Sequence, residues 1–257
     1  MRIKIPEKFM GKLVKGSIER GLANAVKGPV QVTPDKVIVP SQIPTAFNGS
    51  DYVLITPNNQ NSPIYIAKEL SLKGANWGDT HSELHKQSLF MPNPRLFMDY
   101  FLNVKNAAAV NAPLYDGNRV QLAQSEVNEL WDYLSSTNRP KGNCWTWLDA
   151  KYKQDAWFME SGRVGASAIP VPLSPHLVKD GLADLAFNDE GLATTESANR
   201  GYVQGENIYF YHPRENCVAR FGAISNWAYL GCYGDPTDSL TSLGVFACAE
   251  GATAQKT

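Results

Sequence analysis

The sequence lacks most of the features that identify a common enzyme, a membrane protein or a secreted protein. No window approaches the run of about 18 apolar residues that a bilayer-spanning helix needs. The first residues, Met1–Lys8, contain neither an apolar core nor a small-residue cleavage site, so no signal peptide is predicted. The GxSxG, P-loop and GxGxxG patterns are also missing. We therefore expect no membrane insertion, no catalytic residues and synthesis in a cytoplasm.

Excess charge of either sign is missing as well. The net charge is −1 at pH 7, so bulk electrostatics do not favour nucleic acid as a partner. A chain of 257 residues with 43% hydrophobic composition can bury a core in one large or two small domains.

Residues with metal-ligand spacing are scarce. His81 and His85 lie four residues apart, but Glu83 is not adjacent to the first histidine as the HExxH pattern requires. No CxxC pair is present, and buried thiols are the simplest interpretation of the cysteines. We expect no metal and no cofactor. The four cysteines are Cys144, Cys217, Cys232 and Cys248.

The C-terminal part of the chain lacks residue types that are common elsewhere. Between Phe221 and Ala249 there is no Lys, Arg, Glu, Gln or Met. Lys, Glu, Gln and Met make up 41 of the 257 residues, so a segment of this length would ordinarily contain between four and five of them. Randomising the adenines of Asn codons that end in a pyrimidine gives every amino acid except Trp, Met, Lys, Gln and Glu. Only Trp227 lies outside that permitted set.

The same segment predicts a strand with one displayed face, because side chains alternate between the two sides of a strand. Tyr, Ser, Gly and Asn are typical of evolved binding surfaces, although an ordinary Gly/Ser/Tyr loop has the same composition. The displayed face would carry Ser225, Trp227, Tyr229, Gly231 and Tyr233, and the buried face Ala228, Leu230 and Cys232. We assign ligand binding, with Trp227 and Tyr229 as aromatic anchors, to Ile224, Ser225, Asn226, Trp227, Tyr229, Gly231, Tyr233, Gly234, Asp238, Leu240 and Thr241.

Short motifs frame this segment: Val218-Ala-Arg-Phe221, Trp227-Ala-x-Leu230, Asp235-Pro236 and Leu243-Gly-Val245. With them the chain resembles the variable proteins of diversity-generating retroelements, whose variable residues sit on a C-type lectin fold. The resemblance is most specific over about 205–250. It implies a fixed, buried frame under replaceable side chains. That frame would consist of Phe221, Leu230, Leu243, Val245 and Phe246.

The resemblance also implies a fold class and a division of the chain. We expect an α+β, C-type lectin-like fold of two helices and an antiparallel β-sheet over residues 46–257, with the variable region at about 216–250. Strands that end near Cys217 and Cys248 could be neighbours in such a sheet, which leaves a disulfide between them open. Residues 1–45 would form an N-terminal arm with a helix at 6–27, used for docking or oligomerisation, unless that helix simply begins the main domain.

Local patterns predict further elements. Asn93-Pro94 begins one helix, and Ser125 caps another whose apolar stripe starts at Val127. A short acidic helical turn is expected over Asp180–Phe187. Strands are predicted over residues 52–56, 63–67, 143–152 and 207–212, with 156–159 as the hairpin partner of 143–152.

The resemblance implies receptor recognition, with a protein or glycan on a cell surface as ligand. Trp227 is followed by Ala228 and Tyr229, which does not match the Trp-Asn-Asp segment of calcium-dependent lectins, so calcium-dependent sugar binding is not implied. We expect a homo-oligomer or attachment to a virion, displayed on the virion surface after assembly in the host cytoplasm. The alternative is an enzyme resembling formylglycine-generating enzymes that uses Cys232 and Cys248. A structural virion protein is a third possibility.

Overall fold

The computed structural model describes residues 47–57, 62–135, 142–153, 170–224 and 226–250, and the backbone of three short strands. Two of these strands, β1 (Lys8–Phe9) and β2 (Lys12–Leu13), pair in antiparallel fashion. They belong to the first of two compact units, Met1–Val39 and Pro40–Thr257. The predicted helix at 6–27 is therefore wrong at these two strands, and the rest of it lies outside the described residues.

Most strands of the second unit form one large sheet in the order β8-β7-β6-β11-β12-β10-β9, with β13 parallel to β6. All neighbours along this order are antiparallel except β10 and β12, which are parallel. The pair β11 and β12 lies in the middle of the sheet. The strands are β6 (Cys144–Lys153), β7 (Phe158–Glu160), β8 (Val171–Pro172), β9 (Gly181–Asp184), β10 (Asn207–Tyr211), β11 (Val218–Ile224), β12 (Trp227–Gly234) and β13 (Leu243–Gly244).

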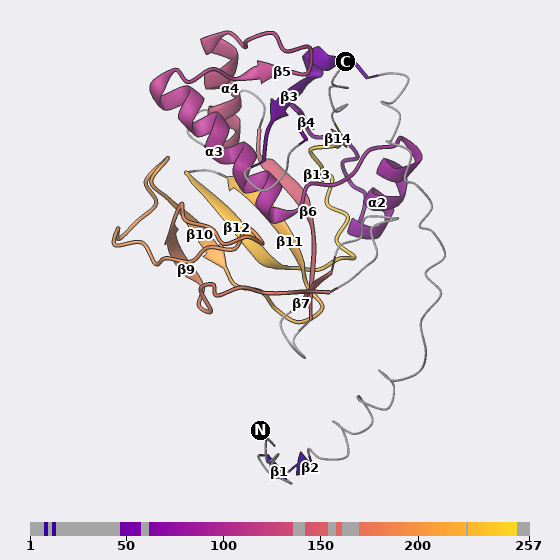
Figure 1. Cartoon of the computed structure of the whole chain (residues 1–257), viewed down its shortest axis with the longest axis vertical. Helices are drawn as coiled ribbons and strands as arrows, with labels where there is room; N and C mark the ends of the chain where they lie inside the picture. Colours follow the sequence, from indigo (N-terminus) through magenta and orange to yellow (C-terminus); the bar gives the residue numbers. More distant parts are fainter. Residues whose placement is uncertain are drawn as a thin grey trace, which may run out of the picture. The chain divides into compact units, whose positions relative to one another are not determined.

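A smaller antiparallel sheet joins the two ends of the second unit (Figure 1). Its strands, in spatial order, are β14 (Cys248–Glu250), β4 (Ile64–Ala67), β3 (Tyr52–Ile55) and β5 (Tyr115–Asp116). A single 3-10 turn, η1 (Gly49–Asp51), precedes β3. The last described strand, β14, thus pairs with β4, which lies near the start of the described part of the second unit.

The described residues contain three α-helices where two were expected: α2 (Trp77–Lys86), α3 (Pro94–Val110) and α4 (Gln124–Ser135). The predicted start of α3 is confirmed, because the Asn93 side chain accepts a 2.8 Å hydrogen bond from the Leu96 backbone N–H. Ser125 is not the cap of α4. The helix already begins at Gln124, and the carbonyl of Ala123 accepts its first backbone hydrogen bonds.

The helices α3 and α4 cover one face of the large sheet (Figure 1). Phe221 of β11 meets Phe97 and Phe101 of α3 at ring-centroid distances of 4.8 and 5.7 Å. Helix α2 packs in a second cluster, where Leu84 lies with Trp147 of β6 and Val218 of β11. The predicted burial of the frame is confirmed, since each side chain is fully buried in Phe221, Leu230, Leu243, Val245 and Phe246.

The strand predictions are confirmed for β3, β4, β6, β10 and the hairpin pairing of β7 with β6. The helical turn expected over Asp180–Phe187 is wrong. Gly181–Asp184 is β9, an edge strand whose residue Leu182 pairs with Tyr209 of β10. Hydrogen bonds to a strand distant in sequence outweigh the weak local helical preference there.

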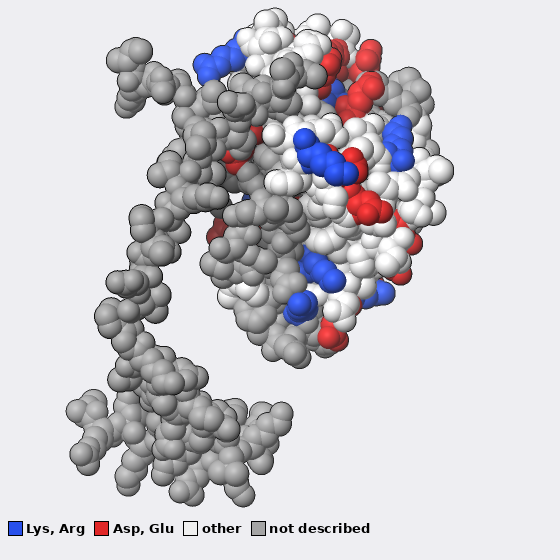
Figure 2. All heavy atoms as spheres, turned by 90° about the vertical axis from the view of Figure 1, so that its right-hand side faces the viewer, with Lys and Arg blue, Asp and Glu red and all other residues white. Residues whose placement is uncertain are grey.

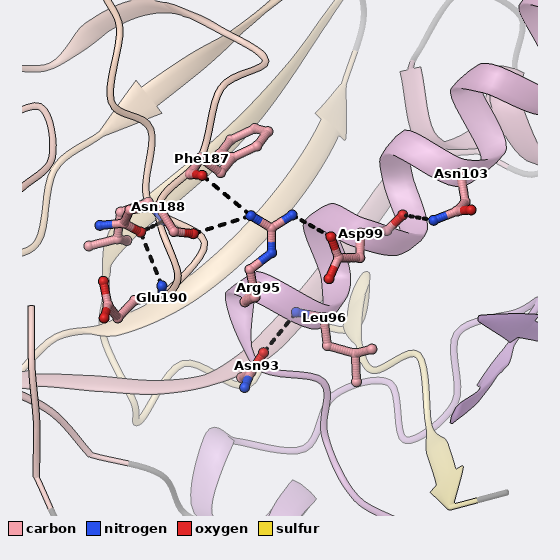
Figure 3. A network of polar contacts seen from close by, with 9 residues as sticks. Asn93, Arg95, Leu96, Asp99, Asn103, Phe187, Asn188 and Glu190 are labelled. Carbon is pink, nitrogen blue, oxygen red and sulfur yellow. Dashed lines mark hydrogen bonds and ion pairs between the residues drawn. The ribbon is translucent and has the colours of Figure 1, made fainter. Parts of the chain in front are cut away.

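The segment between β9 and β10 is tied to the start of α3 by one arginine (Figure 3). The Arg95 guanidinium donates to the backbone carbonyls of Phe187 and Asn188 at 3.4 and 3.2 Å and forms an ion pair with buried Asp99. The Asn188 side chain in turn accepts a 2.8 Å hydrogen bond from the Leu192 backbone N–H. One cation therefore satisfies loop carbonyls that no strand pairs, and it positions the segment that leads to β10.

Gly191 allows this loop to approach the helix. Its φ is +82°, and a Cβ at this position would lie 2.3 Å from the backbone nitrogen of Arg95. A side chain here would meet both backbone strain and a rigid neighbour.

We predict that Gly191→Ala destabilises the fold more than the same change at Gly142. Both glycines have similar positive φ values, but nothing lies within 4 Å of a Cβ on Gly142. Gly142→Ala should therefore cost about 1 kcal/mol for its backbone conformation, and Gly191→Ala roughly 1–3 kcal/mol more for the clash. Denaturant unfolding of both variants measures the difference. Equal losses would mean that the close approach at Gly191 is relieved without cost.

Candidate binding face

The site is built on the side of β10, β11 and β12 that points away from α3 and α4, here called the outer face. The predicted alternation along β12 is confirmed on its inner side, where Ala228, Leu230 and Cys232 are fully buried. On the other side Trp227 and Tyr233 are partly exposed. The sheet therefore separates a packed interior from a partly exposed outer face.

A row of aromatic rings crosses the outer face. Tyr209 of β10 meets Trp227 edge to face at a centroid distance of 4.7 Å, and Tyr211 meets Tyr233 at 5.0 Å and Tyr229 at 5.9 Å. The parallel register that pairs Tyr209 with Tyr229 brings these side chains to the same side. The row of rings on the outer face thus lies on two parallel strands, β10 and β12. Of these two strands, only β12 was assigned to ligand binding.

Tyr209 and Tyr211 were missed in the sequence-based assignment. Their signal is the alternation Ile208-Tyr-Phe-Tyr211, in which Ile208 and Phe210 are fully buried and the two tyrosines are partly exposed. This alternation predicts the strand, but local sequence does not show that β10 lies next to β12.

Tyr229 does not act as a displayed anchor, which corrects the sequence-based assignment. Its side chain is buried, with 7% of its surface exposed, because the ring lies against the backbone of Gly222 on β11. A Cβ on Gly222 would lie 2.3 Å from Cε1 of that ring. Burial raises the pKa of Tyr229 to about 12, although the Arg220 cation lowers it. Tyr229 forms part of the floor on which the exposed rings rest.

Gly231 and Gly234 are also buried, so their assignment to direct ligand contact is wrong. A Cβ on Gly231 would lie 3.0 Å from the Tyr233 ring and 3.3 Å from the Tyr229 ring. At Gly234 it would lie 3.0 Å from the carbonyl oxygen of Val218. These glycines leave room for the neighbouring rings and strand.

Two arginines approach Tyr233. The guanidinium carbon atoms of Arg214 and Arg220 lie 5.3 and 5.0 Å from the ring centroid, a distance at which cations and aromatic rings attract. Arg220 is paired with Asp238 at 3.3 Å, and Arg214 with Asp180 at 2.8 Å. These pairs neutralise the two cations, so the face carries little net charge around Tyr233.

Asp180 also accepts a 2.6 Å hydrogen bond from the ring of His212. Partial burial alone would raise the pKa of Asp180, but hydrogen bonds from His212 and the charge of Arg214 outweigh it and lower that pKa. Asp180 is thereby kept ionised as the counterion at this edge of the face. On the side of the molecule shown in Figure 2, basic and acidic side chains are likewise interspersed among uncharged ones.

The remaining assigned residues lie around the ends of β11 and β12. Ile224 is partly buried and pairs with Trp227, and Asn226 is exposed in the turn between the two strands. Leu240 and Thr241 are exposed in the segment after β12, while Ser225 lies outside the described residues. That segment is held by α2, since the Trp77 backbone N–H donates to the Pro236 carbonyl at 3.1 Å.

An open hollow of about 270 Å³ lies at the Trp227 end of the face. Its walls are Tyr202, Tyr209, Asn226 and Trp227, none of which carries a charge. The Tyr202 hydroxyl donates a 2.9 Å hydrogen bond to the carbonyl of Ser135, which fixes that ring in place.

The two cysteines of the alternative enzyme hypothesis, and the two histidines spaced four residues apart, lie in separate environments. Burial raises the pKa of Cys232 to about 12 despite a 3.2 Å hydrogen bond from the Tyr152 hydroxyl, and Cys248 lies in the other sheet. All four cysteines lie in the described ranges as thiols, so the open disulfide between Cys217 and Cys248 is not formed. His81 is buried 3.3 Å from Asp149, whereas His85 is exposed.

Within the part of the chain that the structure describes, no group of three or more His, Cys, Asp or Glu side chains could hold a metal ion. In the same residues no helix has the length and apolar character needed to cross a membrane.

We predict that Gly222→Ala disrupts the floor of the outer face. The added methyl group would displace the Tyr229 ring, which should destabilise the protein by roughly 1–3 kcal/mol and change the near-UV circular dichroism of the tyrosines. Gly181→Ala in β9 is the matched control, because nothing lies within 4 Å of a Cβ there. If both variants unfold at the same denaturant concentration, Tyr229 is not constrained by Gly222.

Comparisons with known proteins leave the role of this face to be argued from its own residues. No protein-family model matches the chain, and neither a curated protein nor a solved structure matches it.

Proposed function

We propose that the chain is a ligand-recognition protein of the retroelement-diversified class, built on a C-type lectin-like scaffold. The observation that carries this proposal is the outer face itself. Partly exposed side chains such as Tyr233 lie on the outer side of β12, whereas the alternating residues Ala228, Leu230 and Cys232 are fully buried on its inner side. Side chains on one side of the strand can therefore change without altering the core on the other.

The wider architecture supports the proposed scaffold. The α+β fold places α3 and α4 on one face of the large sheet, and β14 pairs with β4 so that the end of the unit returns to its beginning. The motifs around Phe221 and Leu243 supply fully buried frame residues. Rigid strands beneath replaceable side chains are what such a binding surface needs.

The geometry favours binding over thiol chemistry. The nucleophilic form of cysteine is the thiolate, and burial of Cys232 raises its pKa to about 12. At neutral pH its sulfur is therefore a protonated, fully buried thiol. We propose that neither Cys232 nor Cys248 reacts with a substrate, and that the chain is not an enzyme of the oxidase type.

The burial of each residue narrows the list of positions that we expect to vary. Exposed or partly exposed positions can change most freely: Ile224, Asn226, Tyr233, Asp238, Leu240 and Thr241. The glycines at 222, 231 and 234 should stay fixed, because a larger residue would collide with a neighbouring ring or strand. Trp227 should also stay fixed, since adenine randomisation of Asn codons does not produce Trp.

Population sequencing tests this proposal. We expect substitutions in the natural population to concentrate at codons for exposed residues between 216 and 250. The codons for Leu230, Leu243 and the three glycines should not vary. The region that encodes the N-terminal arm is the control. The diversified-binding proposal is wrong if the 216–250 segment varies no more than that control. It is also wrong if codons for buried residues in the segment vary as much as codons for exposed ones.

We further propose multivalent display, as a homo-oligomer or on a virion, with a protein or glycan of a cell surface as the ligand. The assigned face contains few large exposed side chains, so one copy should bind weakly. Simultaneous contacts raise overall affinity by factors of about 10² to 10⁴ when the geometry permits them. Light scattering of the purified chain and its detection on purified particles measure this. A monomer that is absent from every particle would contradict it.

A further inference from the structure

We propose that the hollow formed by Tyr202, Tyr209, Asn226 and Trp227 binds one neutral pyranose ring of a glycan. This inference rests on the proposed recognition function and narrows its ligand class from protein or glycan to glycan. It also assigns a role to Tyr202 and Tyr209, which lie outside the segment proposed to vary.

The shape of the hollow suits a single sugar ring. The rings of Tyr209 and Trp227 stand nearly perpendicular, at 78° with a centroid distance of 4.7 Å, so they form a corner with two aromatic walls. One side of a pyranose ring is lined by C–H groups and packs on an aromatic surface as an apolar face does. A volume of about 270 Å³ lies just below the roughly 300–1,000 Å³ typical of drug-sized sites. The space therefore fits one small ring.

Asn226 supplies the polar contact that a sugar requires. Its side chain is exposed in the turn between β11 and β12 and has no hydrogen-bond partner among the described residues. A carboxamide offers two donor hydrogens and one acceptor oxygen, which matches a pair of adjacent sugar hydroxyls that each donate and accept. An apolar protein side chain would fill the corner but would leave this amide unused.

The walls are preorganised. Tyr202 is held by its 2.9 Å hydrogen bond to the Ser135 carbonyl, and Gln204 donates to the Ser135 hydroxyl at 2.6 Å. Tyr209 lies on β10, which is paired on both sides. Fixed aromatic walls lose little conformational entropy when a ligand binds, which partly offsets the small contact area.

The charges favour a neutral sugar over an acidic one. None of the four lining residues is acidic or basic, and the two arginines over Tyr233 at the other end of the aromatic row, Arg214 and Arg220, are each paired with an aspartate. An anionic ligand that reached Arg214 or Arg220 would compete with the paired aspartate for that cation. A neutral ring involves no such competition.

The experiment uses the full chain and ligand-observed NMR with the methyl glycosides of glucose, galactose, mannose and N-acetylglucosamine. We expect saturable binding of at least one glycoside with a Kd on the order of 1 mM. Trp227→Ala should weaken binding by about tenfold or more, because each factor of ten corresponds to only about 1.4 kcal/mol of lost contact. Asn226→Ala should reduce discrimination between glycosides that differ at one hydroxyl.

Controls separate loss of the site from loss of the fold. Val110→Ala removes an exposed side chain at the end of α3 and should leave binding unchanged. Trp227→Phe keeps an aromatic wall and should retain measurable binding even if Trp227→Ala is poorly folded, which circular dichroism will show.

The outcomes distinguish this inference from the function on which it rests. The sugar proposal is overturned if no glycoside saturates, if Trp227→Ala and Trp227→Phe bind as the parent does, or if only glucuronate or only the apolar probe indole binds. If population sequencing finds diversified codons but no glycoside binds, only the sugar inference is wrong. If a glycoside binds but the codons are not diversified, the retroelement proposal is wrong and the sugar site remains.

Discussion

The opposite orientation of successive side chains along β11 and β12 is the constraint on which the rest of the structure depends. Ring contacts with Phe97 and Phe101 hold Phe221 beneath α3. Leu230 of β12 pairs with Phe221 across the two strands, so its position is fixed as well. Because side chains alternate along a strand, burial of the inner side chains places the remaining ones on the outer face. The aromatic face is thus a consequence of how the core is packed.

Local sequence predicted those parts of the fold whose cause is also local. The start of α3 follows from the Asn93 side chain, which reaches a backbone N–H three residues ahead. The buried side of β12 follows from its alternation. The burial of Phe221 and Phe246, which the structure also shows, was implied by the family resemblance and not by their local sequence. For these elements the interaction partner is either within one helical turn or is simply the core.

The parts that sequence did not predict depend on residues distant along the chain. Tyr229 is buried because Gly222 lies opposite on the neighbouring strand, and only the register of β11 and β12 shows this. Tyr209 joins the face because β10 is parallel to β12. Similarly, β9 replaces a helical turn because Leu182 pairs with that same Tyr209. Register and strand order are tertiary facts that no short window contains.

The insertion of β12 between β11 and β10 has a consequence for how partners can and cannot engage it. Both edges of this strand are already hydrogen-bonded to neighbours, along Ala223↔Ala228 on one side and Phe210↔Leu230 on the other. A peptide therefore cannot extend the sheet at β12 by adding a strand, and self-association through open backbone groups is blocked there. The central place of β12 in the sheet provides this protection whatever side chains the strand displays.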